Sequence, residues 1–203
     1  MMRYTTAVLA NIGPGGRRGL LQIRDRPMIE YVLDAVPDDT EDILIFTQAE
    51  SMDAYVEVAE RFGARVEKSA PQSVDIRFQL DPILRTLSTD GCLLLSCDTP
   101  LINRGVTGFL RDIITKFSAA IPRPSIDRPE FVPAAYRVQS FIKAMDENPE
   151  MKMDELVKKV SNVLYISAQS FRIFDEKLRF LDRVQNQTDV RRVEKILQSM
   201  EQL

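Results

Sequence analysis

Apolar residues in this chain fall into short runs that alternate with amphipathic stretches. The runs at Ala7–Leu9 and Asp42–Gln48 are too short for helices and indicate buried strands. Gly91–Asp98 is the strongest run, and its nearly continuous apolar positions are typical of a central parallel strand that is covered on both faces. Further strands are predicted at 64–69, 118–122 and 162–167.

Between the strands, apolar residues recur at helical spacing. A helix over Pro27–Ala35 shows this at i, i+3, i+4 and i+7 from Met28. Another, over 51–63, has Ser51 as its N-cap and Gly63 at its C-terminal stop. Other helices are predicted at 78–87, 106–117 and 188–200, with Pro82 in the first turn of its helix or at a kink.

This alternation of strands and helices predicts the fold class. We expect a single α/β domain over residues 1–203, Rossmann-like, with a mostly parallel central sheet and helices on both faces. In such sheets, ligands bind beyond the carboxyl ends of the strands. The loop after the first strand and the segment after Gly91–Asp98 are therefore the places to search for a site.

Composition narrows the possible partners. The net charge of −3 argues against broad nucleic-acid binding, which needs a basic face. No apolar segment approaches the length of a membrane span, and the N-terminal apolar run is too short for a secretory signal. Cys92 and Cys97 are an odd number of positions apart on one strand, so we expect them on opposite faces and unpaired. A reduced, cytoplasmic setting is the expectation.

The absence of histidine restricts the chemistry further. It excludes imidazole bases, histidine metal ligands and Ser-His-Asp catalysis. Two cysteines without histidine also argue against a structural zinc site. An enzyme made from this chain would use carboxylates, arginine, lysine, backbone amides and a hard metal ion such as Mg²⁺.

A glycine-rich loop, Asn11–Arg18, follows the first predicted strand. Glycines let the backbone approach a phosphate and expose its N–H groups, and two arginines here could neutralise the charge. The loop is neither a P-loop nor a dinucleotide fingerprint, and the alternative is an ordinary β–α connection with solvent-facing arginines. The candidate phosphate ligands are Gly13, Gly15, Gly16, Arg17 and Arg18.

Two aspartates are candidates for the same edge of the sheet. Asp98 directly follows the central strand, and a turn at Thr99–Pro100 would leave it facing the crevice. One carboxylate together with substrate phosphates is a common way to hold Mg²⁺, although an aspartate that only begins a turn is the alternative. Asp81, before Pro82, could face the crevice or cap a helix.

Four segments in order resemble a known group of enzymes. The segments are "LLQIRDRPMIEYVLDAV" (20–36), "LLLSCDTPLI" (93–102), "AAIPRPSIDRPEFVPAAYR" (119–137) and "FLDRVQNQTDVRRVEKIL" (180–197). Together they resemble the molybdenum cofactor guanylyltransferases, to which the cobinamide-phosphate guanylyltransferases and sugar-phosphate nucleotidyltransferases are related.

The resemblance implies a reaction. Such enzymes transfer a nucleoside monophosphate from an NTP, here GTP, to a phosphate on a small acceptor with Mg²⁺ and release of pyrophosphate. The acceptor phosphate is already ionised, so no histidine base is needed. The resemblance assigns Arg18 and Asp98 to catalysis and Asp98 to the metal. It assigns nucleotide binding to Ala10, Asn11, Gly13, Gly15, Gly16, Arg17, Arg18 and Asp81.

The sequence also departs from the family pattern. The family's "AGG" is Ala10-Asn11-Ile12 here, the loop is shorter, and the family lysine falls on Arg18. Gln185 falls at a family asparagine. These departures keep open a non-catalytic relative that binds a nucleotide or a protein partner, and an oligomeric α/β domain with an unrelated ligand. A monomer or homodimer is expected.

Overall fold

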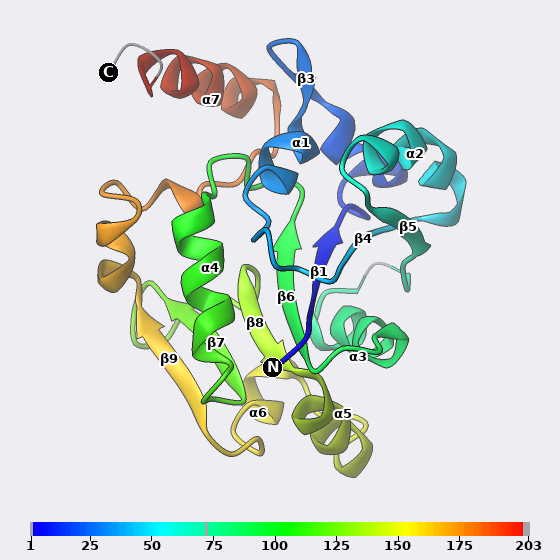
Figure 1. Ribbon diagram of the computed structural model, residues 1–203, viewed down its shortest axis with the longest axis vertical. Helices are drawn as coiled ribbons and strands as arrows, with labels where there is room; N and C mark the ends of the chain where they lie inside the picture. The colour runs from blue at the N-terminus through cyan, green and yellow to red at the C-terminus, as the bar shows by residue number, and fades with distance from the viewer. Residues whose placement is uncertain (1, 72, 201–203) are drawn as a thin grey trace.

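The computed structural model describes residues 2–71 and 73–200, and its centre is a seven-stranded sheet in the order β5-β4-β1-β6-β8-β7-β9 (Figure 1). All neighbouring strands pair in parallel except β8, which is antiparallel to both β6 and β7. The strands are Tyr4–Leu9 (β1), Asp42–Thr47 (β4), Arg65–Lys68 (β5), Gly91–Ser96 (β6), Ala119–Arg123 (β7), Ala134–Arg137 (β8) and Val163–Ser167 (β9). The predicted fold class is confirmed.

The register makes one edge of this sheet the place where loops gather. Leu9 lies opposite Phe46 of β4 and opposite Ser96 of β6, so these three strands end close to the same level. Because β8 runs the other way, the segment that enters it at Ala134 also lies at this edge. The loops after β1 and β6 and before β8 are therefore neighbours.

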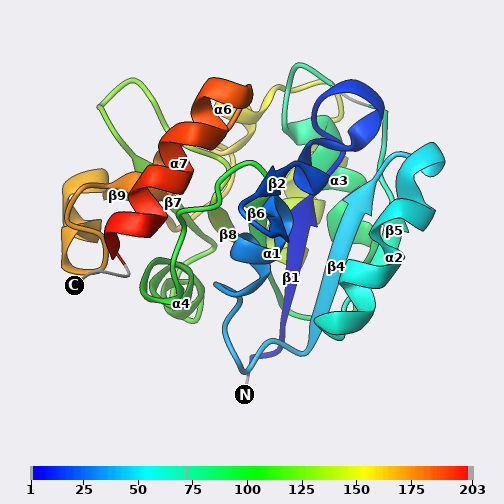
Figure 2. The ribbon, with the colours of Figure 1, turned by 90° about the horizontal axis from the view of Figure 1, so that it is seen from above.

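Helices cover both faces of the sheet. On one face α1 (Met28–Leu33), α2 (Met52–Arg61) and α4 (Arg104–Ile113) pack against one apolar cluster. On the other face α3 (Arg77–Thr86), α5 (Val138–Glu147) and α6 (Met153–Leu156) pack against a second cluster. Figure 2 shows α1 and α4 on one side of the sheet and α3 on the other.

The two cysteines confirm this two-sided packing. Cys92 lies in the cluster beneath α3 and α5, whereas Cys97 lies in the cluster beneath α1 and α4. Both are buried and free, as the alternation of side chains along a strand predicts.

The last helix, α7 (Gln187–Met200), covers neither face of the sheet. It packs on the short hairpin of β2 (Gln22–Ile23) and β3 (Arg26–Pro27). The contact is apolar and is formed by Ile23, Met28, Val184, Val190 and Val193. The C-terminal segment is thereby held beside the start of the chain. None of the helices within the described residues is long and apolar enough to span a bilayer.

One predicted helix begins earlier than its pattern indicates. The helix α3 starts at Arg77, whose backbone N–H donates to the Asp75 carboxylate at 2.9 Å. Pro82 therefore lies inside the helix, beyond the first turn, and the prediction that Asp81 caps the helix is wrong. The N-cap position is Ile76, and the carboxylate that accepts from the first turn belongs to Asp75, which the pattern did not single out.

Candidate functional site

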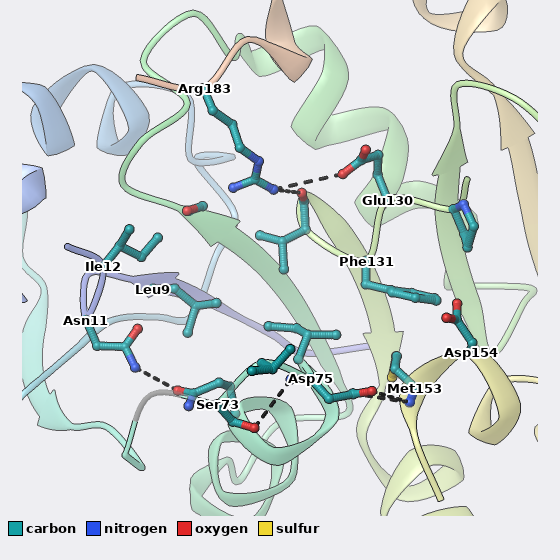
Figure 3. Close-up of a pocket in the computed structure, with 16 residues that line it drawn as sticks. Leu9, Asn11, Ile12, Ser73, Asp75, Glu130, Phe131, Met153, Asp154 and Arg183 are labelled. Carbon is teal, nitrogen blue, oxygen red and sulfur yellow. Dashed lines mark hydrogen bonds and ion pairs between the residues drawn. The ribbon is translucent and has the colours of Figure 1, made fainter. Parts of the chain in front are cut away.

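A cavity of about 380 Å³ opens at the carboxyl edge of β1 and β6 (Figure 3). Leu9, Asn11 and Ser96 lie at its base, where the two strands end. One wall is the 73–79 segment that leads into α3, and the other combines 129–132 with the start of α6. Arg183, from the segment before α7, lies over the opening between these walls in Figure 3.

A pair of buried amides forms one wall of the cavity. The Asn11 Nδ2 donates to Gln79 Oε1 at 2.7 Å, and Gln79 Nε2 donates to the Pro71 carbonyl at 2.5 Å. Within the described residues no donor reaches Asn11 Oδ1, although the residue lines the cavity. This oxygen is therefore available to accept a hydrogen bond from a ligand.

Asp98 lies just behind the cavity and is only 3% exposed. Its Oδ1 accepts hydrogen bonds from Ser96 Oγ at 2.6 Å and from Arg183 Nη1 at 3.0 Å. The backbone N–H of Val184 donates to the Asp98 carbonyl at 2.8 Å. Two of the sequence segments that resemble the family, the one around Asp98 and the closing one, thus meet in space.

The second oxygen of Asp98 is open. No described residue donates a hydrogen bond to Oδ2. This oxygen is not among the fully buried side-chain atoms of the described residues that lack a partner, so part of its surface is accessible. A hard divalent cation prefers such an oxygen. No group of three potential metal-ligating side chains exists within the described residues, so further ligands would have to come from substrate phosphates and water.

The glycine loop is held from below by α2 and the residue before it. Ser51 Oγ donates to the Gly15 carbonyl, and Tyr55 Oη donates to the Gly16 carbonyl at 2.9 Å. Ser51 does occupy the N-cap position of α2, but its hydroxyl makes no capping bond because it serves the loop instead. The loop carbonyls therefore turn inward, toward the protein.

Part of the loop's N–H groups are already used. The amides of Gly16, Arg17 and Arg18 donate to carbonyls within the loop at 3.2–3.4 Å. Those of Gly13 and Gly15 meet no acceptor in the described part of the chain, so they are among the loop amides that remain for a phosphate. The predicted contribution of Gly16 would require one of these internal bonds to open.

The two arginines of the loop lack an internal counter-charge. Neither Arg17 nor Arg18 makes an ion pair or side-chain hydrogen bond with any described residue. Arg18 is half-buried and packs against Gly13, where an added Cβ would lie 3.0 Å from its Nε. Burial raises the pKa of the Cys97 thiol, and the nearby charge of Arg18 opposes that rise. The residue after Arg18, Gly19, packs against Cys97, where an added Cβ would lie 3.0 Å from the Cys97 Cβ, so the end of the loop lies beside the strand end that carries Asp98.

Of the predicted site residues, only Asn11 lines this cavity within the described part of the chain, and the glycines and arginines of the loop and the aspartate predicted to bind the metal lie outside its lining. Ala10 is fully buried under the loop, where its N–H donates to the Phe46 carbonyl at 2.8 Å. Asp81 does not line the cavity, because its carboxylate pairs along α3 with Arg85 at 2.7 Å and Arg77 at 3.7 Å. A direct contact of Asp81 with a nucleotide in this cavity does not fit that placement.

Three residues of the site were not singled out from the sequence: Ser96, Gln79 and Arg183. Arg183 lies inside the closing segment, two positions before Gln185, which was matched to a family asparagine. Gln185 is exposed, and its backbone N–H donates to Asp189 at 2.9 Å, near the start of α7. The signal that could have identified Arg183 in the sequence was its positive charge inside a segment that resembles the family.

Comparison with known proteins identifies the family. The model of the family described as "MobA-like NTP transferase domain" matches residues 13–163 of this chain. A probable molybdenum cofactor guanylyltransferase of Clostridium perfringens is 25% identical over 131 residues, which span 61% of this chain and 61% of that protein.

Solved structures show the same fold. Molybdopterin-guanine dinucleotide biosynthesis protein A from Archaeoglobus fulgidus superposes with a TM-score of 0.72 at 20% identity, over 96% of this chain and 99% of that one. A 4-diphosphocytidyl-2C-methyl-D-erythritol synthase from Anaerococcus prevotii gives a TM-score of 0.73 at 14% identity, over 97% and 99%. Since the family match covers most of the chain, this protein belongs to the MobA-like NTP transferase domain family.

Proposed function

We propose that the protein is a Mg²⁺-dependent nucleotidyltransferase that moves GMP from GTP to a phosphate on a small acceptor and releases pyrophosphate. The observation that carries the proposal is the meeting of two features at one edge of the sheet. Two unpaired arginines lie on the glycine loop, and an aspartate with one open oxygen lies at the end of β6. Relatives named as guanylyltransferases support the choice of GTP.

The nucleotide would lie across the end of β1. The N–H groups of Gly13 and Gly15 and the guanidinium groups of Arg17 and Arg18 would hold the triphosphate. The base would enter the cavity beside Asn11, whose open Oδ1 accepts from an N–H donor. Guanine presents two neighbouring N–H groups on its Watson–Crick edge, which favours it over bases that present an acceptor at the ring nitrogen.

The transfer needs little acid–base chemistry. An oxygen of the acceptor phosphate forms a bond to the α-phosphorus, and the bond from that phosphorus to the bridging oxygen of the β-phosphate breaks. The electron pair leaves with pyrophosphate, and no proton has to move. Mg²⁺, held by Asp98 Oδ2 and by substrate phosphates, would neutralise charge on the transferred group. Arg18 would stabilise the charge that grows on the departing pyrophosphate.

Pyrophosphate release tests the proposal. The purified protein is given each of the four NTPs with Mg²⁺ and a panel of phosphate monoesters, and pyrophosphate is detected by a coupled assay. We expect release with GTP and at least one monoester. In parallel, GTP at about 100 times its dissociation constant should add about 2.7 kcal/mol of apparent stability, and the other NTPs less. No thermal shift with any NTP would contradict the proposal.

A non-catalytic relative is the second candidate, and the loop favours it. Three of the loop amides are used internally and Asp98 is paired with Arg183, so both could be resting features of a binding protein. Such a protein would show the thermal shift with GTP but no pyrophosphate with any acceptor. Detection of pyrophosphate would exclude it.

A further inference from the structure

Arg183 differs in charge from the other ionisable side chains of the cavity. Asp75, Glu130 and Asp154 also line it, whereas Arg183 is the one lysine or arginine among its lining residues in the described part of the chain. Asp75 is committed elsewhere, since its carboxylate accepts from the backbone N–H groups of Arg77 and Met153. An anionic ligand in this cavity would therefore find its positive partner in Arg183.

The guanidinium of Arg183 has unused donors. Nη1 donates to Asp98 Oδ1 at 3.0 Å and Nη2 donates to the Val132 carbonyl at 2.8 Å. The Glu130 carboxylate is 3.9 Å from Nη2, too far for a hydrogen bond. A guanidinium carries five N–H groups, so three remain, on a side chain that is 33% exposed at the cavity. Figure 3 shows this group reaching toward Glu130 across the opening.

The sheet order places Arg183 on a particular side of Asp98. The strand β6, which leads to Asp98, lies between β1 and β8. The glycine loop with Arg18 extends from the β1 side, whereas Arg183 is tied to Val132 on the β8 side. In an in-line displacement the attacking oxygen and the leaving oxygen lie on opposite sides of the phosphorus. If the loop holds the leaving pyrophosphate, the attacking phosphate comes from the side of Arg183.

We propose that Arg183 binds the phosphate group of the acceptor, while the hydrogen bond from its Nη1 holds Asp98 in position. This inference rests on the proposed function for the identity of the acceptor as a phosphate monoester. The planar guanidinium of Arg183 can hold two oxygens of a phosphate with two parallel N–H groups, a geometry that a lysine ammonium does not offer. The acidic side chains Glu130 and Asp154 would then lie against the non-phosphate part of the acceptor.

Inorganic phosphate serves as the probe, because the acceptor is not needed for this test. Phosphate binding is measured by calorimetry, with and without a saturating non-hydrolysable GTP analogue and Mg²⁺. The proteins are the wild type, Arg183→Gln, Arg183→Lys, and Arg192→Gln as control. Arg192 pairs with Asp189 on α7 and does not line the cavity. Melting temperatures are recorded for all four proteins.

We expect Arg183→Gln to weaken phosphate binding by about tenfold or more, Arg183→Lys to weaken it less, and Arg192→Gln to leave it unchanged. The affinity for the GTP analogue should fall by less than the affinity for phosphate, because Arg183 acts on the nucleotide site only through Asp98. The inference is overturned if the wild type binds no phosphate, if Arg183→Gln weakens only the GTP analogue, or if it lowers only the melting temperature. Phosphate binding that depends on Arg183 in a protein that binds no nucleotide would support the inference and contradict the proposed function.

Discussion

Gly13 and Gly15 lie two positions apart in the loop after β1, but their backbones impose different demands. Gly13 has φ 76° and ψ −178°, a region that is essentially restricted to glycine. A Cβ there would also lie 3.0 Å from Arg18 Nε and 3.2 Å from Arg18 Cβ. Gly15 has φ 60° and ψ 18°, the left-handed helical region, with no atom within 4 Å of an added Cβ.

A matched pair of alanine substitutions tests this difference. Gly13→Ala should lower the free energy of unfolding by about 1–3 kcal/mol and displace Arg18, so that GTP affinity falls as well. Gly15→Ala should cost about 1–2 kcal/mol and leave Arg18 in place. Urea unfolding and GTP titration measure the two effects. Equal losses of GTP affinity in the two variants would contradict the role given to Gly13.

The buried cysteines lead to a prediction about how the free energy of unfolding depends on pH. Burial raises the pKa of the Cys92 thiol from 9.0 to about 12, and it also raises that of Cys97. Above the unfolded pKa the unfolded chain releases a proton that the folded chain keeps. The free energy of unfolding should therefore fall as the pH rises from about 9 toward about 12.

Urea unfolding across this pH range measures the slope. Burial also raises the pKa of Tyr55 and of Tyr136, which adds to the slope, so Cys92→Ala isolates one thiol. The variant should show a shallower slope than the wild type. In the folded protein at pH 8, thiol reagents should react with neither cysteine, and rapid labelling without denaturant would contradict the burial.

At the scale of elements, α2 supports the loop that would bind phosphate. Ser51 and Tyr55, at the N-terminal end of this helix, both donate to carbonyls of the glycine loop. Those contacts turn the carbonyls away from the site, and an anion is repelled by carbonyl oxygens but attracted by N–H groups. The position of α2 against β4 and β5 therefore affects the shape of a loop that belongs to β1.

Removal of one hydroxyl tests this support. Tyr55→Phe should lower the free energy of unfolding by about 0.5–1.5 kcal/mol and weaken GTP binding, because the Gly16 carbonyl loses a donor. Tyr4→Phe is the control, since Tyr4 lies in the same apolar cluster and its hydroxyl makes no hydrogen bond within the described residues. Thermal denaturation and GTP titration compare the two. A similar loss of GTP affinity in both variants would contradict the account.

The same scale shows what the sequence could and could not predict. The central strands were predictable because a strand covered on both faces must be apolar at nearly every position. The strand β8 was missed because its four residues follow a polar, proline-containing stretch, and its pairing with β6 depends on tertiary contacts. Asp98 and the glycine loop could be singled out as candidates because each follows a strand directly. Arg183 reaches Asp98 from 85 positions away, so no local pattern could place it.

At the scale of the whole molecule, one edge of the sheet collects loops from distant parts of the chain. The glycine loop comes from the beginning, Asp98 from the middle and Arg183 from near the end. The helix α7 holds this arrangement together, because it packs on the β2–β3 hairpin. The segment just before it is tied to the middle of the chain by the hydrogen bond from the Val184 N–H to the Asp98 carbonyl. A ligand that contacts all three segments would therefore stabilise the whole fold rather than one part of it.

The measurement that tests the central claim most directly is calorimetric titration of GTP, with Mg²⁺ and with EDTA, into the wild type, Asp98→Asn and Asp81→Asn. We predict that Mg²⁺ strengthens GTP binding to the wild type by about tenfold or more, because the open oxygen of Asp98 shares the ion with the triphosphate. Asp98→Asn should lose this Mg²⁺ dependence, and Asp81→Asn, which changes a carboxylate already paired with Arg85 along α3, should keep it. GTP binding that is absent, or that is equally tight with Mg²⁺ and with EDTA in the wild type, would contradict the claim.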